Sequence, residues 1–149
     1  MIRKAKLSDM KIIHRLIAEQ AKSGHILARA ISDLYSQVRD FSVLEESGEM
    51  IGCGSLHIVW EDLAEIRSLA VKTSHQGQRL GTQLIEALLE EARGMGIRRV
   101  FVLTYRQRLF ERLGFSVMDK SQLPHKIWAD CIRCTKFPEC DEIALVRTA

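Results

Sequence analysis

The chain has 149 residues, of which 46% are hydrophobic and 28% charged. A chain of this length can bury roughly two thirds of the surface that its unfolded form exposes, which suits one domain. Lys and Arg number 22 against 19 Asp and Glu, a formal net charge of +3, and the basic residues lack the aromatic interleaving of a nucleic-acid-binding surface. The composition therefore argues against a nucleic-acid partner.

The N-terminal segment argues against membrane insertion. Charged residues interrupt every apolar run in residues 1–20, so the segment resembles neither a signal peptide nor a membrane-spanning helix. We expect a cytoplasmic protein with no membrane partner.

The first part of the chain predicts a strand and two helices. Residues 2–5 form a short strand-like run, and apolar side chains then recur at helical spacing from Met10 to Ala21. Ser8 or Asp9 can cap this helix. A weaker helical pattern through Leu34 predicts a second, short helix.

The middle of the chain predicts three strands and a long helix. Residues 41–45 and 50–60 are strand-like, and the polar turn between them contains a glycine, which indicates a hairpin. Residues 63–71 form a central strand, in which one set of side chains alternates with another: Ala64, Ile66, Ser68 and Ala70 with Glu65, Arg67, Leu69 and Val71. The period changes from 2 to 3.6 across residues 72–81, so an amphipathic helix follows.

The C-terminal part predicts three further strands and a short helix. Residues 99–104 are apolar throughout, as in a strand buried on both faces, and should lie beside the central strand. A short helix is expected at 107–113, and strands at 115–119 and 142–147. The order of elements predicts an α/β fold with a mixed sheet, of the α+β type.

The turn between the central strand and its helix is a candidate anion site. Gly77 and Gly81 let a ligand approach the backbone, and the N–H groups that begin a helix carry partial positive charge, which suits a phosphate. The alternative is a simple connection between two elements. A mononucleotide P-loop is excluded, since Gly81-Thr82 lacks the preceding lysine.

The letters of this turn resemble a family motif. The run Gln76-Gly77-Gln78-Arg79-Leu80-Gly81, after Leu69-Ala70-Val71, resembles the acyl-CoA motif Q/R-x-x-G-x-G/A of the GNAT acetyltransferases. Arg79 stands in the place of the middle glycine, a departure that is tolerated if its φ is negative. A guanidinium there could pair with a CoA phosphate.

The resemblance extends over nearly the whole chain. The runs GHILAR, AEIRSLAV, VFVLT and LFERLGF together resemble the acetyltransferase domain of N-acetylglutamate synthases, in a short form without an amino-acid-kinase domain. The resemblance implies one N-acetyltransferase domain over residues 1–149, with the GNAT fold: a twisted, mostly antiparallel sheet with splayed middle strands, flanked by helices. It also implies a role in arginine biosynthesis and a possible homodimer.

The resemblance implies that acetyl-CoA is the co-substrate and that a small amino acid, with glutamate expected, is the acceptor. The residues expected to bind acetyl-CoA lie at the end of the central strand and in the turn: Leu69, Ala70, Val71, Gln76, Gly77, Gln78, Arg79, Leu80, Gly81 and Thr82. Backbone N–H groups near Leu69 to Val71 could receive the thioester carbonyl oxygen.

Proton transfer needs a base and, in many relatives, an acid. Glu65 occupies the place of the glutamate base of several GNAT enzymes; the alternatives are a solvated carboxylate or an ion-pair partner for Arg67. The family's general-acid tyrosine falls on Phe110, which cannot donate a proton. Tyr105 is a substitute only by proximity, and the thiolate could otherwise leave unassisted.

Three cations are candidate contacts for an acidic acceptor. Guanidinium groups bind carboxylates in bidentate fashion, and Arg29 lies where glutamate-type relatives also place an arginine. Arg67 on the central strand and Lys126 are the other two. Each of the three could equally be an ordinary surface charge.

The cysteines and histidines suggest no covalent catalysis. Cys131, Cys134 and Cys140 form C-x2-C-x5-C, and His125 or Asp141 is close enough in sequence to supply a fourth zinc ligand. A structural zinc is possible there but not favoured, and free thiols or a disulfide are the alternatives. Cys53 is expected to be a small buried residue, and the histidines structural.

Two other functions remain open from the sequence. The chain could acetylate another small amine or a protein N-terminus. Alternatively, it could bind acyl-CoA without turnover, which the phenylalanine at position 110 would allow.

Overall fold

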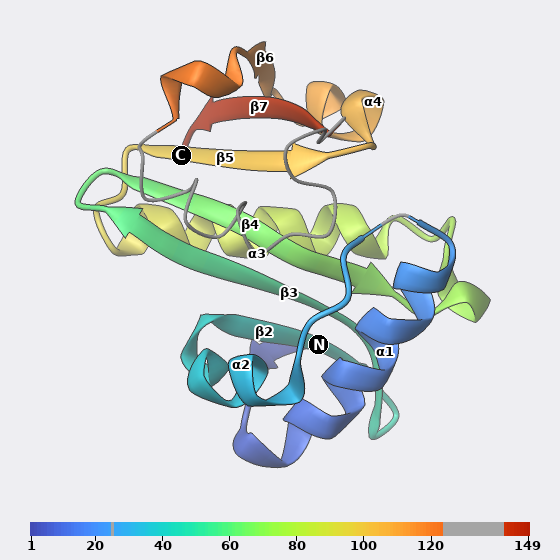
Figure 1. The fold of residues 1–149 in the computed structure, drawn as a ribbon. Helices are drawn as coiled ribbons and strands as arrows, with labels where there is room; N and C mark the ends of the chain where they lie inside the picture. Colours follow the sequence, from blue (N-terminus) through green and yellow to red (C-terminus); the bar gives the residue numbers. More distant parts are fainter. Residues whose placement is uncertain (25, 124–141) are drawn as a thin grey trace.

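The computed structural model describes residues 1–24, 26–123 and 142–149. They form a seven-stranded sheet with strand order β1-β2-β3-β4-β5-β7-β6 (Figure 1). The strands are β1 (Ile2–Lys4), β2 (Phe41–Glu46), β3 (Glu49–Trp60), β4 (Leu63–Val71), β5 (Arg99–Thr104), β6 (Ser116–Met118) and β7 (Ile143–Thr148). The α-helices of the described chain are α1 (Met10–Lys22), α2 (Ile31–Ser36), α3 (Leu80–Gly94) and α4 (Gln107–Arg112). The predicted mixed α/β fold and the order of its elements are confirmed.

The sheet is mostly antiparallel. Strands β2 and β3 form the predicted hairpin, whose two-residue turn has positive φ at Ser47 (52°) and Gly48 (78°), a backbone typical of tight hairpins. Strand β4 pairs antiparallel with β3 and parallel with β5. The apolar strand 99–104 therefore lies beside the central strand, as predicted.

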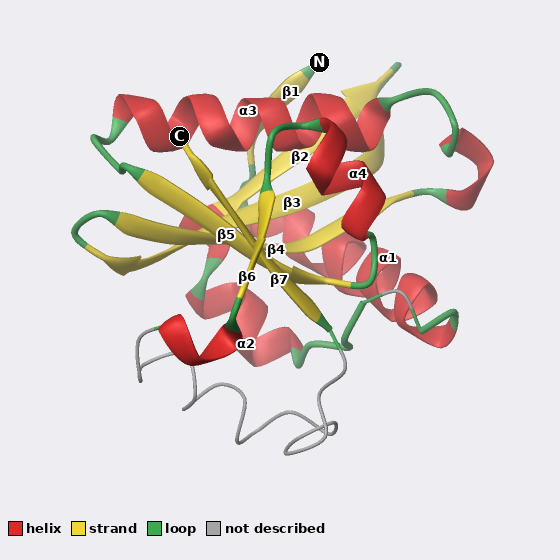
Figure 2. Ribbon diagram, turned by 90° about the horizontal axis from the view of Figure 1, so that it is seen from above, coloured by secondary structure: helices red, strands yellow, loops and turns green. Residues whose placement is uncertain are grey.

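The helices lie on the two faces of the sheet. Helix α3 covers one face, and α1 and α2 cover the other (Figure 2). Ala64 and Ile66 of β4 pack against Ile85 and Leu88 of α3. Since successive side chains of a strand point to opposite faces, Glu65 and Arg67 lie on the face of α1 and α2.

A bulge in β4 corrects the predicted alternation. Cys53 pairs with Ala70, but Ser55 pairs with Arg67, so β4 has one residue more than β3 at this point. Ser68 takes φ 54°, and Ala70 then packs in the cluster with α1 instead of joining Ala64 on the α3 face. The alternation predicted across residues 63–71 is therefore wrong after Arg67, because a bulge shifts the faces by one residue.

Strands β4 and β5 separate at the same place. Their parallel pairing joins residues 63–66 to residues 99–102 and ends there in the described chain. Beyond it, Ala70 and Val71 pair only with β3 among the described residues. The predicted splay of the middle strands is thus present, and it exposes one edge of β4 to a ligand.

None of the helices in the described part of the chain is both long and apolar enough to cross a membrane.

Candidate active site

The connection between β4 and α3 has the backbone of an anion site. After the short turn η3 (Thr73–His75), Gly77 takes φ 85°, and α3 begins at Leu80 with no described side chain capping it. The N–H groups of its first turn are therefore available to a ligand. A Cβ placed on Gly77 or Gly81 would meet no atom within 4 Å. The space beside these glycines is open, which suits a pyrophosphate.

Arg79 differs from the sequence expectation. Its φ is 61° and its ψ 23°, in the left-handed region, whereas the substitution for glycine was expected to need a negative φ. For a residue with a side chain, this conformation costs about 1–2 kcal/mol of conformational free energy. The turn keeps the backbone that the family's glycine would favour, and the exposed guanidinium stands at the start of α3.

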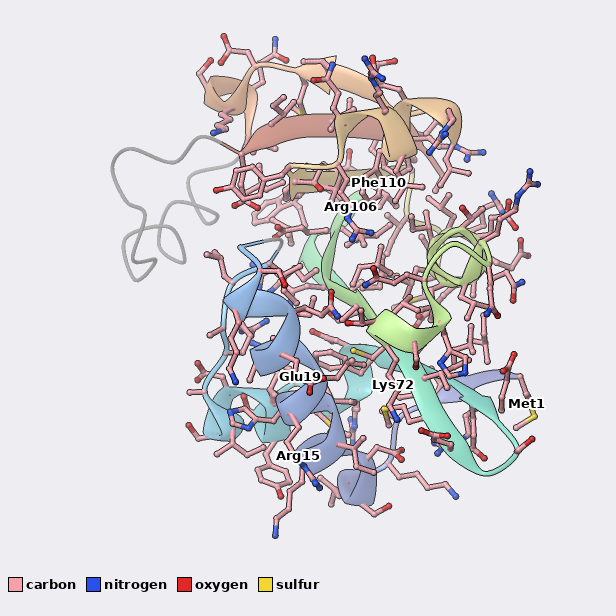
Figure 3. The ribbon with its side chains drawn as sticks, turned by 90° about the vertical axis from the view of Figure 1, so that its right-hand side faces the viewer. Met1, Arg15, Glu19, Lys72, Arg106 and Phe110 are labelled. Carbon is pink, nitrogen blue, oxygen red and sulfur yellow. The ribbon has the colours of Figure 1, made fainter. Side chains whose placement is uncertain are left out.

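Further positive charge lies on this side of the molecule. Figure 3 views the side on which β4 ends and α3 begins, and the labelled Lys72 and Arg106 both lie there. Lys72 donates a hydrogen bond to Glu49 and pairs with it, which lowers the pKa of that exposed carboxyl. Arg106 is exposed, and its backbone N–H donates to Thr104 Oγ1 at 2.9 Å.

Glu65 is buried and paired. Its side chain is 7% exposed, and Arg67, at 15%, donates from Nε to Glu65 Oε1 at 2.7 Å. The alternative of a solvated carboxylate is therefore wrong, and pairing with Arg67 is confirmed. The pair lies beside the splay, on the face of α1 and α2.

Arg29 reaches the same face from the segment before α2. Its Nη2 donates to Gln37 Oε1 at 2.6 Å, and its Nη1 to Ser68 Oγ at 3.3 Å. Arg29 is thus anchored to Ser68, the residue of the β4 bulge that follows Arg67 in the chain. The structure brings together Glu65, Arg67 and Arg29, while Lys126 lies outside the described residues.

Two side chains at this site were missed in the sequence. His57 is the β3 neighbour of Glu65, and its Nδ1 lies 2.9 Å from Asp40 Oδ2. Gln20, in α1, is 6% exposed and donates to the carbonyl oxygen of Val71 at 3.2 Å. A polar residue on an otherwise apolar helix stripe was the only sequence signal for Gln20.

Three other residues considered in the sequence analysis are buried or half-buried. Phe110 is buried and makes an edge-to-face contact with Phe115, with ring centroids 5.2 Å apart. Cys53 is buried, which raises the pKa of its thiol to about 12 and makes it unreactive. Tyr105 is half-buried at the end of β5.

The candidate ligands of a structural zinc all lie outside the described residues: Cys131, Cys134, Cys140, His125 and Asp141. Among the residues that the structure does describe, no group of three or more His, Cys, Asp or Glu side chains could hold a metal ion.

Comparison with known proteins agrees with this geometry. Residues 13–115 match the sequence model of the acetyltransferase (GNAT) family. An uncharacterized N-acetyltransferase of Chlorobaculum tepidum is 39% identical over 150 residues, covering 99% of this chain and 95% of that protein. An amino-acid acetyltransferase of Mycobacterium tuberculosis is 33% identical over 136 residues, covering 89% and 78%.

Solved structures are also similar. N-acetylglutamate synthase of Neisseria gonorrhoeae, complexed with coenzyme A and N-acetyl-glutamate, has a TM-score of 0.90 at 30% identity over 99% of this chain. This chain spans only 34% of that protein. Rv2747 of M. tuberculosis, in complex with CoA and NLQ, has a TM-score of 0.86 at 27% identity and is covered over 99% of its length.

The splayed sheet, the open turn before α3 and these relatives define an acetyl-CoA-dependent acyltransferase. The chain belongs to the GNAT family of N-acetyltransferases.

Proposed function

We propose that this enzyme transfers the acetyl group of acetyl-CoA to the α-amino group of glutamate, as a step of arginine biosynthesis. One observation carries the proposal: Glu65, Arg67 and Arg29 gather on one face of β4, beside the point where β4 and β5 separate. Two guanidinium groups there favour an acceptor with more than one carboxylate. The amino-acid acetyltransferases among the relatives support the same class of acceptor.

The open turn fits acetyl-CoA. The N–H groups of Leu80, Gly81 and Thr82 would hold the pyrophosphate, with Gln76 to Arg79 around it. The edge of β4 at Leu69 to Val71, which has no β5 partner in the described chain, would hold the pantetheine arm. Acetyl-CoA supplies an acyl group activated as a thioester.

The proposed role of Glu65 is to take the proton of the acceptor's ammonium group. An amine attacks only when neutral, and a carboxylate held beside the cleft can accept the proton directly or through water. The hydrogen bond from Arg67 Nε fixes the position of this carboxylate. Backbone N–H groups at the end of β4 would stabilise the negative charge that develops on the carbonyl oxygen during attack.

The proposed role of Arg29 is to bind a carboxylate of the acceptor. Gln37 holds its guanidinium in place, so little side-chain freedom is lost on binding. Lys126 stays a candidate for a further contact.

The test measures the release of CoA thiol from acetyl-CoA with each of the twenty amino acids, with product masses confirmed. Glutamate should give the highest kcat/KM. Glutamine, which keeps the α-carboxylate but lacks the side-chain charge, should react with a KM at least tenfold higher, because a charge-assisted contact contributes about 1.5–3 kcal/mol.

Arg29→Ala serves as the matched variant. It should raise the KM for glutamate, so that the KM values for glutamate and glutamine become more alike. The KM for acetyl-CoA should stay unchanged. Equal kcat/KM for glutamate and glutamine in the wild type, or turnover only with other amines, would contradict the proposal.

A further inference from the structure

Gln20 is a buried polar residue on the otherwise apolar face of α1. It lies on the α1 stripe that otherwise buries Ile13, Leu16 and Ile17. Its Nε2 donates to Val71 O at 3.2 Å, and its Oε1 accepts from Gln76 Nε2 at 3.3 Å. Gln76 Nε2 also donates to Val71 O, at 3.2 Å. These bonds join α1, the end of β4 and the first residue of the acyl-CoA motif.

The pairing of β4 shows which way the Val71 peptide groups point. Lys72 N–H donates to Ile51 O, and Val71 lies opposite Gly52. Hydrogen-bonded and non-hydrogen-bonded pairs alternate along an antiparallel ladder. Val71 is therefore in a non-hydrogen-bonded pair, and its N–H and C=O both point away from β3, toward the splay.

Gln20 and Gln76 determine which backbone group of Val71 can form a hydrogen bond with a ligand. Both side-chain amides donate to the carbonyl oxygen, so this acceptor is satisfied within the protein. The N–H of Val71 points to the same side, where β4 has no β5 partner among the described residues. Val71 thus presents its N–H donor to the splay, and the hydrogen bonds of Gln20 and Gln76 to its carbonyl oxygen fix the peptide group that follows it.

We propose that Gln20 is a positioning residue for acetyl-CoA. By holding the Val71 carbonyl and Gln76, it keeps the Val71 N–H aimed at an oxygen of the bound pantetheine arm or thioester, and it fixes where the turn before α3 begins. The inference rests on the proposed placement of acetyl-CoA at the splay and in the turn. Within the described part of the chain, Gln20 forms its hydrogen bonds with Val71 and Gln76 and none with Glu65 or Arg29, so it should act on the donor substrate alone.

The experiment compares two buried or half-buried glutamines with different contacts. Gln20→Met keeps the length of the side chain and removes its hydrogen bonds to Val71 and Gln76. Gln37→Met removes the hydrogen bond that holds Arg29. Isothermal titration gives the Kd for acetyl-CoA without acceptor, steady-state kinetics give both KM values, and thermal unfolding reports stability.

Gln20→Met should raise the Kd for acetyl-CoA about 5- to 30-fold, as expected for one or two lost hydrogen bonds, with the acceptor KM within about twofold of wild type. Gln37→Met should raise the acceptor KM and leave the Kd for acetyl-CoA unchanged. Gln76→Met should also weaken acetyl-CoA binding. The Gln20→Met/Gln76→Met double variant should weaken binding by less than the product of the two single effects, because both side chains donate to the same carbonyl oxygen.

A purely structural role predicts a different result. If Gln20→Met melts at lower temperature but binds acetyl-CoA with the wild-type Kd, the positioning role is overturned. If Gln20→Met does not fold, the exposed Gln76→Met decides: wild-type binding of acetyl-CoA by this variant overturns the inference. Gly81→Asp, which places a carboxylate in the turn, separates the two proposals. If that variant also binds as the wild type does, the placement of acetyl-CoA fails, and with it the basis of the Gln20 role.

Discussion

At the scale of single residues, the proposed mechanism depends on one buried carboxylate, that of Glu65. Glu65→Gln keeps the shape of the side chain and removes its capacity to accept a proton. We expect kcat to fall about 10²- to 10⁴-fold, the usual contribution of a general base. The rate of thiol release with saturating glutamate, measured across pH, is the direct test.

The control for Glu65→Gln is binding without turnover. Its Kd for acetyl-CoA should equal that of the wild type, since Glu65 lies on the sheet face opposite α3. Retention of full activity across the pH range would mean that another group takes the proton. His57, held by Asp40 next to Glu65, would then be the first residue to substitute.

The candidate site could be predicted from sequence only in part. Glu65 and Arg67 are two positions apart on one strand, so a period of two places them on one face. Gln20 and Val71, or Asp40 and His57, come together only through the packing of different elements. Long-range pairs of this kind leave no periodic signal, which is why both contacts were missed.

At the scale of elements, one substitution at the start of α3 should affect stability and acetyl-CoA binding in opposite directions. Gly81→Asp adds a carboxylate in open space at the first turn of a helix, where negative charge stabilises by about 0.3–1 kcal/mol. The same charge repels a phosphate. We expect an unchanged or higher melting temperature together with a Kd for acetyl-CoA raised more than about tenfold.

Gly81→Ala is the matched control for the turn. Its methyl group also enters open space but carries no charge, and the family motif accepts alanine here. It should bind acetyl-CoA within a few-fold of the wild type. A loss of affinity equal to that of Gly81→Asp would indicate a steric cause and would contradict the electrostatic account.

The contact between the sheet and α3 makes another element-scale prediction. A Cβ at Gly52 would lie 3.1 Å from Leu84 Cδ1 and 3.2 Å from the carbonyl oxygen of Ala70. Gly52→Ala should therefore destabilise the fold by about 1–3 kcal/mol, as overpacking does. Gly94→Ala, at the last residue of α3, meets no atom within 4 Å and should stabilise by up to about 1 kcal/mol.

Urea unfolding measures both glycine variants against the wild type. Equal stability of Gly52→Ala and the wild type would show that Leu84 can move aside, so that the close approach of β3 to α3 is not required. A loss of stability in Gly94→Ala would contradict the helix-propensity argument.

The elements themselves were predictable because their patterns are local. Helix spacing, the Ser47-Gly48 turn and the apolar run 99–104 each specify one element. The bulge at Ser68 was not predictable, since a serine with positive φ gives no sequence signal and the apolar pattern continues past it. That bulge decides which face Ala70 takes, so the central strand was placed correctly but its side chains only in part.

At the scale of the whole molecule, β4 contributes to both halves of the proposed site. Its α3 side and splayed edge would serve acetyl-CoA, and its other face would serve the acceptor. At the edge of the sheet formed by β1, Arg3 forms hydrogen bonds with Asp9 at 2.8 and 3.0 Å and with Glu45 of β2. Asp9 also accepts from the backbone N–H of Lys6, so it caps the turn before α1 instead of α1 itself, contrary to the sequence expectation.

This network makes stability depend on pH. The hydrogen bond from Arg3 holds the pKa of the buried Asp9 below its ordinary value. Because the pKa of Asp9 is lower in the folded state than in the unfolded state, its ionised form stabilises the fold. This stabilisation is complete at a pH above the unfolded-state pKa of about 4, and it is lost as the pH falls through the folded-state pKa. Asp9→Asn should therefore cost about 1–3 kcal/mol at pH 7, and its difference from the wild type should shrink steadily below pH of about 4. Glu49→Gln, which removes an exposed pair with Lys72, should change the free energy of unfolding at pH 7 far less than Asp9→Asn does, because solvent screens that pair. Urea unfolding from pH 7 to the acid limit of folding decides: a constant difference for Asp9→Asn would mean that Asp9 acts through its shape and not through its charge.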